Sequence, residues 1–242
     1  PRNPYADRYD LARLSKEHTA LQKHLATNPK GEQTIDFSDS QAVFHLNKAL
    51  LVADFGLTDY MLPTGYLIPP VPGRLDYLLH LNEFLKAQFG IHAKARLKGL
   101  DVGCGANAIY CILGAQHFKW SMVGAESDAD AQGIAKANLG LTPGLSDSIE
   151  LRLQQNKSFL FKHIIKPGEY FDFTLCNPPF YASKEEATKA SLAKQKNLGL
   201  ARSSGEFAQN FAGQANELWC NGGEALFVKR LIKESRQFKK QV

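Results

Sequence analysis

The sequence predicts an α/β fold with a doubly wound, mostly parallel sheet. Leu97–Ala108 has the pattern of a short apolar strand, a Gly-x-Gly-x-x-Ala turn and the start of a helix. Phe171–Cys176 has the pattern of a second buried strand, which ends at an Asn-Pro-Pro turn. Helical patterns separate the strand patterns, and such alternation is typical of βαβ units. We therefore expect a Rossmann-like sheet with helices on both faces.

Length and composition exclude several classes of protein. The chain has 242 residues, of which 44% are hydrophobic and 22% charged, enough for one sizeable core and a small extension. No apolar run approaches the ~20 residues that span a bilayer, so we expect a cytoplasmic protein without a membrane partner. The 4 cysteines and 7 histidines show no metal-ligand spacing, so we expect reduced thiols and no metal. A net charge of +5 is compatible with a polyanionic partner but does not require one.

Residues 1–35 are expected to form a basic helical extension. Apolar or aromatic side chains recur three or four residues apart at Leu11, Leu14, His18, Leu21 and Leu25. This spacing predicts one amphipathic helix, which the turn at Thr27–Gly31 ends. The polar side of the extension is rich in lysine and arginine, which suits either a phosphate partner or a solvated helix face.

Residues 36–242 are expected to form the main domain, and two helices begin it. Asp39 can cap a helix that Gly56 closes. Three prolines then predict a stiff, extended connector, followed by a helix that starts near Arg74 and stops at Gly90. An arginine fixed at a helix start can bind a ligand carboxylate through two hydrogen bonds, although a solvated surface arginine is the commoner outcome.

The glycine turn indicates a nucleotide-type ligand. Gly103, Cys104 and Gly105 allow a tight turn and close approach of a ligand to the following helix. The next strand, 121–125, ends at Glu126, where a carboxylate can accept the hydrogen bonds of a ribose diol. Asp101 precedes the turn, where it could meet an ammonium group and would repel a pyrophosphate. This favours S-adenosylmethionine over a nicotinamide dinucleotide.

The turn Asn177-Pro178-Pro179-Phe180 suits a flat ring that bears an amine. Proline cannot extend a strand ladder, so the strand must end at Cys176 or Asn177. The Asn177 amide oxygen and the Pro178 carbonyl offer two acceptors, and Phe180 offers a face on which adenine can stack. The alternative is a structural turn with Phe180 in the core. Together with the glycine turn, this motif indicates a methyltransferase that acts on a planar nitrogen.

Three further elements complete the sequence pattern. Asp128 can cap a helix that reaches Leu139, and 149–153 alternates as a third strand. Loops at carboxyl strand ends line the ligand crevice of such sheets, so Asn156 or Ser158 could bind the adenine of the cofactor. A Lys-rich loop is expected over 181–206, and a helix with a basic far end follows residue 224.

These motifs together resemble the RlmF-type 23S ribosomal RNA adenine-N6 methyltransferases, whose eukaryotic relatives methylate U6 small nuclear RNA. The resemblance is carried by these segments: 36–37, 54–56, 71–74, 101–105, Glu126, 177–180 and 222–230. It implies a class I S-adenosylmethionine-dependent methyltransferase, with Arg74, Gly103, Glu126 and Ser158 near the cofactor. It also implies that Asn177, Pro178 and Phe180 hold the target adenine and that the basic amino-terminal arm contacts RNA.

The resulting hypothesis is N6-methylation of one adenosine in 23S rRNA, flipped into the Asn-Pro-Pro-Phe pocket, by a monomer. Such a sheet needs three further strands, yet only 63 residues without a strong strand pattern follow Pro179, so we expect C-terminal strands to be missing from this chain. Two alternatives remain open. One is a glutamine-N5 methyltransferase acting on a release factor, which also uses an Asn-Pro-Pro turn. The other is a non-catalytic RNA-binding or dinucleotide-binding module.

Overall fold

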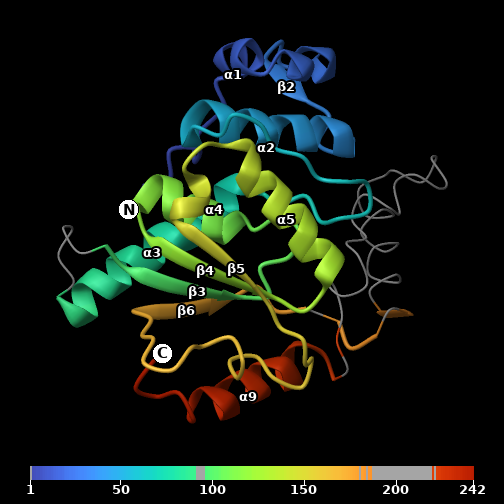
Figure 1. Ribbon diagram of the computed structural model, residues 1–242. Helices are drawn as coiled ribbons and strands as arrows, with labels where there is room; N and C mark the ends of the chain where they lie inside the picture. The colour runs from blue at the N-terminus through green and yellow to red at the C-terminus, as the bar shows by residue number, and fades with distance from the viewer. Residues whose placement is uncertain (1, 91–95, 180, 184, 187–219, 221) are drawn as a thin grey trace.

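The computed structural model describes residues 2–90, 96–179, 181–183, 185–186, 220 and 222–242, and its centre is a four-stranded sheet (Figure 1). The strands are β3 (Lys98–Val102), β4 (Ser121–Glu126), β5 (Ile149–Leu153) and β6 (Phe173–Cys176). Their order in the sheet is β5-β4-β3-β6, and every pair is parallel. The prediction of a Rossmann-like parallel sheet is confirmed.

Helices and loops cover both faces of the sheet, because successive strand residues point to opposite faces. On one face, Met122 and Phe173 pack with α3 (Val71–Phe89) and α4 (Ile109–Phe118), and α5 (Ala129–Leu141) lies beside them. On the other face, Leu100 and Val123 pack against the 159–171 segment and α9 (Gly223–Ser235). The sheet is therefore doubly wound, as the sequence predicts.

The order in which strands are added to the sheet changes direction at β3, and this change determines where the site lies. The first two connections run outward from β3 to β4 and β5, and the third returns to β6 on the other side of β3. In open α/β sheets, ligands bind at the carboxyl ends of the strands at such a reversal.

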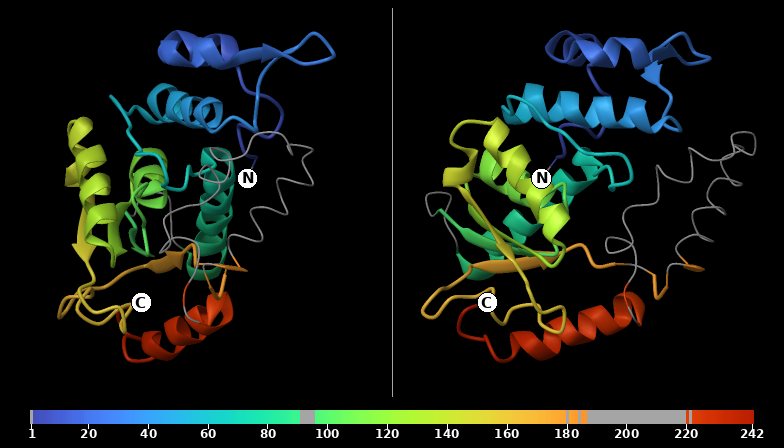
Figure 2. Two further views of the ribbon diagram at one scale, coloured as in Figure 1. Left: turned by 90° about the vertical axis from the view of Figure 1, so that its right-hand side faces the viewer. Right: turned by 45° about the vertical axis from the view of Figure 1, so that its right-hand side comes forward.

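The amino-terminal part forms a separate layer over α2 (Ser40–Phe55), at the end of the molecule opposite α9 (Figure 2). It contains α1 (Leu11–Glu17), the 3-10 helix η1 (Thr19–His24), and the antiparallel strands β1 (Leu25–Thr27) and β2 (Gln33–Ile35). The proposed domain boundary after residue 35 stays a prediction; α1 and η1 pack on α2, which lies beyond it.

The single helix expected over Leu11–Leu25 is wrong. The α-helix ends at His18, whose ring nitrogen lies 2.8 Å from Nδ1 of His45 on α2. The chain then tightens into η1, which buries Leu21 completely, and Leu25 begins a strand. A spacing of three or four residues fits either helix type, so periodicity alone could not reveal the break.

The two helices before the sheet follow the expected caps, with one correction. The Asp39 side chain accepts a hydrogen bond from the Gln41 N–H, and Gly56 ends α2 with φ 69°. α3 begins at Val71 rather than at Arg74, because proline is tolerated in the first turn of a helix, where no intrahelical N–H bond is lost. Arg74 still lies in the first turn.

Beyond β6, the described residues include α9 and the turns that flank it. Most of the loop expected over 181–206 lies outside the described residues. Within the described ranges, no helix combines the length and apolar character that a membrane span requires. No group of three or more His, Cys, Asp or Glu residues in these ranges is placed to hold a metal ion.

Candidate active site

A cavity of about 440 Å³ opens at the carboxyl ends of β3, β4 and β6. Its volume suits a cofactor-sized ligand. Seven of the residues predicted for the site line it: Arg74, Asp101, Gly103, Cys104, Gly105, Glu126 and Asn177. The glycine turn and the Asn-Pro-Pro turn, about 70 residues apart in the chain, therefore meet at one cavity, at the topological switch point of the sheet.

The glycine turn is fixed to the end of β4. Gly103 and Gly105 have φ 79° and 64°, a region that glycine enters without strain. The Gly103 N–H donates to the Ala125 carbonyl at 2.8 Å, and the Gly105 N–H donates to Oε2 of Glu126 at 2.8 Å. A Cβ on Gly103 would meet no atom within 4 Å, so a ligand can approach the backbone here.

Asp101 lies in the cavity wall with an unsatisfied oxygen. Its side chain is 1% exposed, and its Oδ1 has no hydrogen-bond partner among the described residues. The Cys111 thiol is 3.8 Å from Oδ2, a weak contact. Burial, and then the neighbouring Glu126 carboxylate, raise the pKa of Asp101 to about 8. A cationic ligand group would supply the missing partner.

Glu126 is already held by backbone donors. Its Oε1 accepts from the Ser127 and Asp128 N–H groups at 2.7 and 2.9 Å, in addition to the bond from Gly105. A carboxylate has about four acceptor positions, so one remains for a ligand hydroxyl. Cys104 also lines the cavity, and burial raises the pKa of its thiol well above the usual range, so the thiol stays protonated.

Arg74 connects α3, α4 and the end of β6. Its Nη1 lies 2.9 Å from both the Tyr110 hydroxyl oxygen and Oδ1 of Asn177. The guanidinium carbon is 5.4 Å from the centre of the Tyr110 ring. Arg74 forms no ion pair with a described acid and lines the cavity, so its remaining N–H groups are available to a ligand carboxylate.

The structure does not bring every predicted residue into the cavity wall. Asn156 and Ser158 are exposed and do not line the cavity, and the Asn156 side chain accepts the Ser158 N–H at 2.9 Å within its own turn. Pro178 lies between two lining residues but is not one itself. Phe180 lies outside the described residues. Lining the cavity shows where a residue lies and not what it does, so the roles of all eleven predicted residues stay predictions.

Sequence reasoning missed several lining residues. They are Tyr66, Leu67, Asn107, Tyr110, Gln154, Lys157, Phe227 and Arg230, among others. Gln154 directly follows β5, so the rule that selected Asn156 and Ser158 could have found it. Tyr110 and Phe227 carried no such signal, since only the packing of α4 and α9 on the sheet brings them to the cavity.

A parallel Rossmann-like sheet whose glycine turn, post-strand acid and Asn-Pro-Pro turn share one cavity defines the class of S-adenosylmethionine-dependent methyltransferases. Within this class, a family model described as RNA methyltransferase matches residues 1–242, and the chain belongs to that family.

Curated relatives agree with this family. The ribosomal RNA large subunit methyltransferase F of Christiangramia forsetii is 46% identical over 242 residues, which are 100% of this chain and 83% of the relative. The protein of the same name from Escherichia fergusonii is 43% identical over 100% of this chain and 77% of its own length. The resemblance to the RlmF-type enzymes is confirmed, and the chain is a methyltransferase.

Solved structures show the same fold. The human Mettl16 catalytic domain in complex with MAT2A 3′UTR hairpin 1 has a TM-score of 0.75 and 33% identity, over 98% of this chain and 76% of that one. The N-terminal domain of human METTL16 in complex with SAH has a TM-score of 0.72 and 30% identity, over 98% and 77% of the two chains.

Proposed function

We propose that the chain transfers a methyl group from S-adenosylmethionine to N6 of an adenosine in 23S rRNA. The observation that carries this proposal is the shared cavity. It has the unsatisfied Asp101 oxygen and the glycine turn in its wall, together with the Asn177 amide. The names of the curated relatives support ribosomal RNA as the substrate.

The cavity residues fit the cofactor group by group. Asp101 Oδ1 has no donor among the described residues, and an amino-acid ammonium would supply one. The remaining N–H groups of Arg74 suit a carboxylate, and the last acceptor position of Glu126 suits a ribose hydroxyl. When bound, S-adenosylmethionine supplies an electrophilic methyl group on its sulfonium centre.

Asn177 is proposed to hold the target amine. Its Oδ1 accepts one hydrogen bond from Arg74, and its second lone pair can accept from an adenine amine. With the Pro178 carbonyl as second acceptor, both amine hydrogens are held. This favours a pyramidal nitrogen whose lone pair is localised rather than delocalised into the ring. No strong base is needed, since the amine becomes acidic once it is methylated.

The target base must leave its stack to reach this pocket. Extrusion of a base costs a few kcal/mol, and stacking on an aromatic side chain offsets part of that cost. Phe180 is proposed to provide the stacking face. In-line placement of nitrogen, methyl carbon and sulfur then supplies a large share of the rate enhancement.

Replacing Asn177 tests the assignment directly. We expect Asn177→Ala to bind S-adenosylhomocysteine like the wild type in calorimetry. Its methyl transfer to rRNA should fall by about 10²-fold or more, because one of two acceptors for the amine is lost. Asn82→Ala removes the same group from α3, away from the cavity wall, and should leave both quantities unchanged. Wild-type turnover in Asn177→Ala would reject the role of this residue.

The substrate class needs its own experiment. The protein is incubated with labelled cofactor and either deproteinised 23S rRNA or a release factor. We expect label in RNA that digests to N6-methyladenosine. Label in the release factor instead would replace the proposal by glutamine methylation. Calorimetry with S-adenosylhomocysteine against NAD separates both enzymes from a dinucleotide-binding module, which would bind only the second ligand.

A further inference from the structure

Two segments beside the cavity carry a concentrated positive charge. Residues 157–166 and 223–240 together hold nine lysines and arginines against two glutamates. Their excess of cations is larger than the net charge of +5 of the whole chain. Six of the exposed cations in these segments are called the α9 surface here: Lys162, Lys229, Lys233, Arg236, Lys239 and Lys240.

Within the part of the chain that the structure describes, these charges have no acidic partner. None of the six forms an ion pair there, whereas the nearby Lys166 pairs with Glu150 at 2.7 Å. Glu234 on α9 is turned inward, where its carboxylate accepts the backbone N–H groups of 160–162. It therefore does not neutralise the surface.

The cations continue from α9 into the turns after it. Lys229 and Lys233 are four residues apart on one side of the helix, and Arg236, Lys239 and Lys240 follow in the turns beyond Ser235. Like charges at such spacing destabilise an isolated helix. A helix dipole favours a cation in the last turn, such as Lys233, but it does not explain Lys229 one turn earlier.

The opposite side of α9 is occupied by the core. Phe227 and Leu231 pack beneath the sheet with Leu100 and Val123, so this apolar face is not available to enter a bilayer. Lys229 and Lys233 are thus held on a rigid support, a 13-residue helix that is ~20 Å long.

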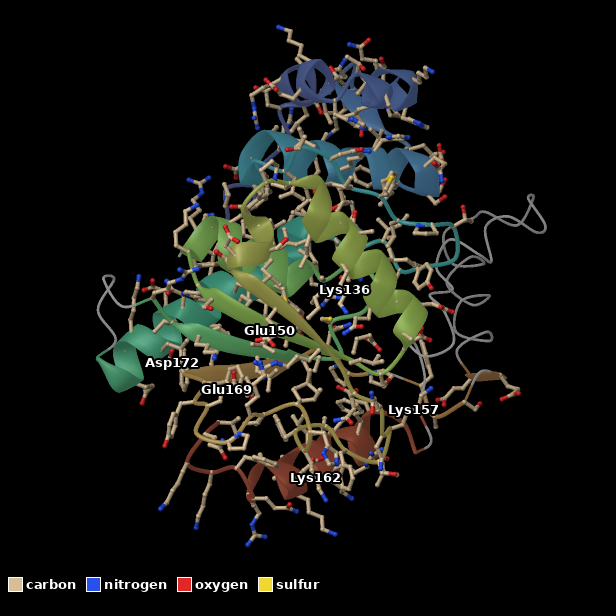
Figure 3. All side chains as sticks on the ribbon, in the orientation of Figure 1. Lys136, Glu150, Lys157, Lys162, Glu169 and Asp172 are labelled. Atoms are coloured by element: carbon tan, nitrogen blue, oxygen red, sulfur yellow. The ribbon has the colours of Figure 1, made fainter. Side chains whose placement is uncertain are left out.

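The α9 surface begins at the cavity. Lys157 and Arg230 line the cavity itself, and the Arg230 guanidinium donates to the Lys157 carbonyl at 2.9 Å. Figure 3 shows Lys157 and Lys162 beside α9, while Lys136 projects from α5. A strand of RNA that leaves the cavity on this side would therefore meet a line of cations.

We propose that the α9 surface binds the phosphate backbone of the RNA that flanks the target nucleotide. The inference rests on the proposed function, since it takes the cavity to hold one adenosine of a longer RNA. Exposed lysines contact phosphates rather than base edges, so binding by this surface should depend on phosphate charge rather than on sequence.

The test removes two charges from the surface and two from elsewhere. Lys233→Gln with Lys239→Gln is compared with a control, Lys86→Gln with Lys136→Gln, exposed positions on α3 and α5 that also lower the net charge by two. Binding of a fluorescent single-stranded RNA is measured by anisotropy over a series of salt concentrations. We expect the slope of log affinity against log salt to become shallower by about 1.4 in the α9 variant, at ~0.7 for each phosphate that is no longer neutralised, and to stay unchanged in the control.

Methyl transfer provides the second readout. In the α9 variant, KM for a long rRNA fragment should rise about tenfold, while kcat and transfer to a minimal oligonucleotide stay at the wild-type value. If the two double variants bind and react alike, the proposal for the α9 surface is overturned while the proposed function stands.

If the wild type binds RNA with the expected salt dependence but methylates none, the proposed function fails while the proposal that the α9 surface binds RNA stands. Loss of binding to phosphatidylserine vesicles without loss of RNA binding would assign the surface to a membrane and overturn the proposal.

Discussion

Arg74 determines how the Asn177 side chain presents itself to the cavity. A guanidinium can only donate hydrogen bonds, so its contact with Asn177 fixes the amide oxygen, and not the amide nitrogen, on that side. The amide cannot flip without losing this bond. Tyr110 accepts a bond from the same Arg74 nitrogen, and its ring lies 5.5 Å from that of Tyr77. We therefore predict that Tyr110 positions Asn177 by acting through Arg74.

Removing the Tyr110 hydroxyl tests this role. Tyr110→Phe keeps the aromatic ring beside Arg74 and deletes only the acceptor. A hydrogen bond to a charged group contributes about 1.5 kcal/mol or more, so we expect kcat to fall about tenfold. The affinity for S-adenosylhomocysteine should change less, which steady-state kinetics and calorimetry measure separately. Tyr77→Phe is the matched control. Tyr77 is 44% exposed, and the change deletes the same hydroxyl from the ring that lies beside Tyr110. Equal kinetics of the two variants would contradict the role.

Among individual residues, the sequence predicted best the positions of those site residues that lie at strand ends or in turns. Asp101, Gly103, Glu126 and Asn177 lie at carboxyl strand ends, and all parallel strands bring these ends to one edge. The link from Arg74 to Tyr110 could not be predicted, because it depends on how α3 packs against α4. Pattern rules locate the ends of elements, whereas side-chain partners between helices follow from packing.

At the scale of elements, the segment between β5 and β6 depends on α9. Three consecutive backbone N–H groups, of Leu160, Phe161 and Lys162, donate to the Glu234 carboxylate at 2.8 to 3.1 Å. Glu234 is only 9% exposed. A single side chain from a later helix thus replaces the capping that a regular crossover helix would give to its own first turn.

Replacing this carboxylate should loosen the segment. Glu234→Gln leaves one oxygen for three donors and turns an amide N–H₂ toward one of them. We expect a loss of about 2 to 3 kcal/mol in the free energy of unfolding, measured by urea denaturation. Amide hydrogen exchange of 160–162 should accelerate more than that of the β4 amides. Glu224→Gln, exposed on the first turn of the same helix, should change neither quantity. Unchanged exchange at 160–162 would show that other contacts hold the segment.

Sequence patterns predicted the strands of the central sheet better than helix limits, although they missed β1 and β2. β5 has the expected bounds and β6 the expected end, since short apolar runs between turn residues leave few alternatives. The helix expected over 11–25 failed at His18, where a contact with His45 on another helix, invisible to local periodicity, accompanies a change of helix type. α3 begins earlier than expected, at Val71, because proline is compatible with either an extended connector or the first turn of a helix, and the sequence alone does not distinguish the two.

At the scale of the whole molecule, a stack of three histidines joins the amino-terminal layer to α2. The His45 ring lies 5.1 Å from that of His18 and 4.9 Å from that of His24, between ring centres. Burial, and then the neighbouring His18, His24 and Lys48, lower the pKa of His45 to about 4, with Asp39 acting in the opposite direction. The stack is therefore compatible with a neutral His45 and is weakened when the ring gains a proton.

The stability of the protein should accordingly decrease in mild acid. In the unfolded chain the pKa of His45 is near 6.5, so between about pH 6.5 and about pH 4 the unfolded state binds more protons than the folded state. The stability that a neutral His45 contributes is present above this window and is lost as pH falls through it.

We expect the free energy of unfolding, from urea denaturation at a series of pH values, to decline more steeply with acid in the wild type than in His45→Gln. His80→Gln, an exposed histidine on α3, should keep the wild-type slope. If His45→Gln and the wild type lose stability in parallel, the acid sensitivity of the layer lies in other groups and the histidine stack does not sense pH.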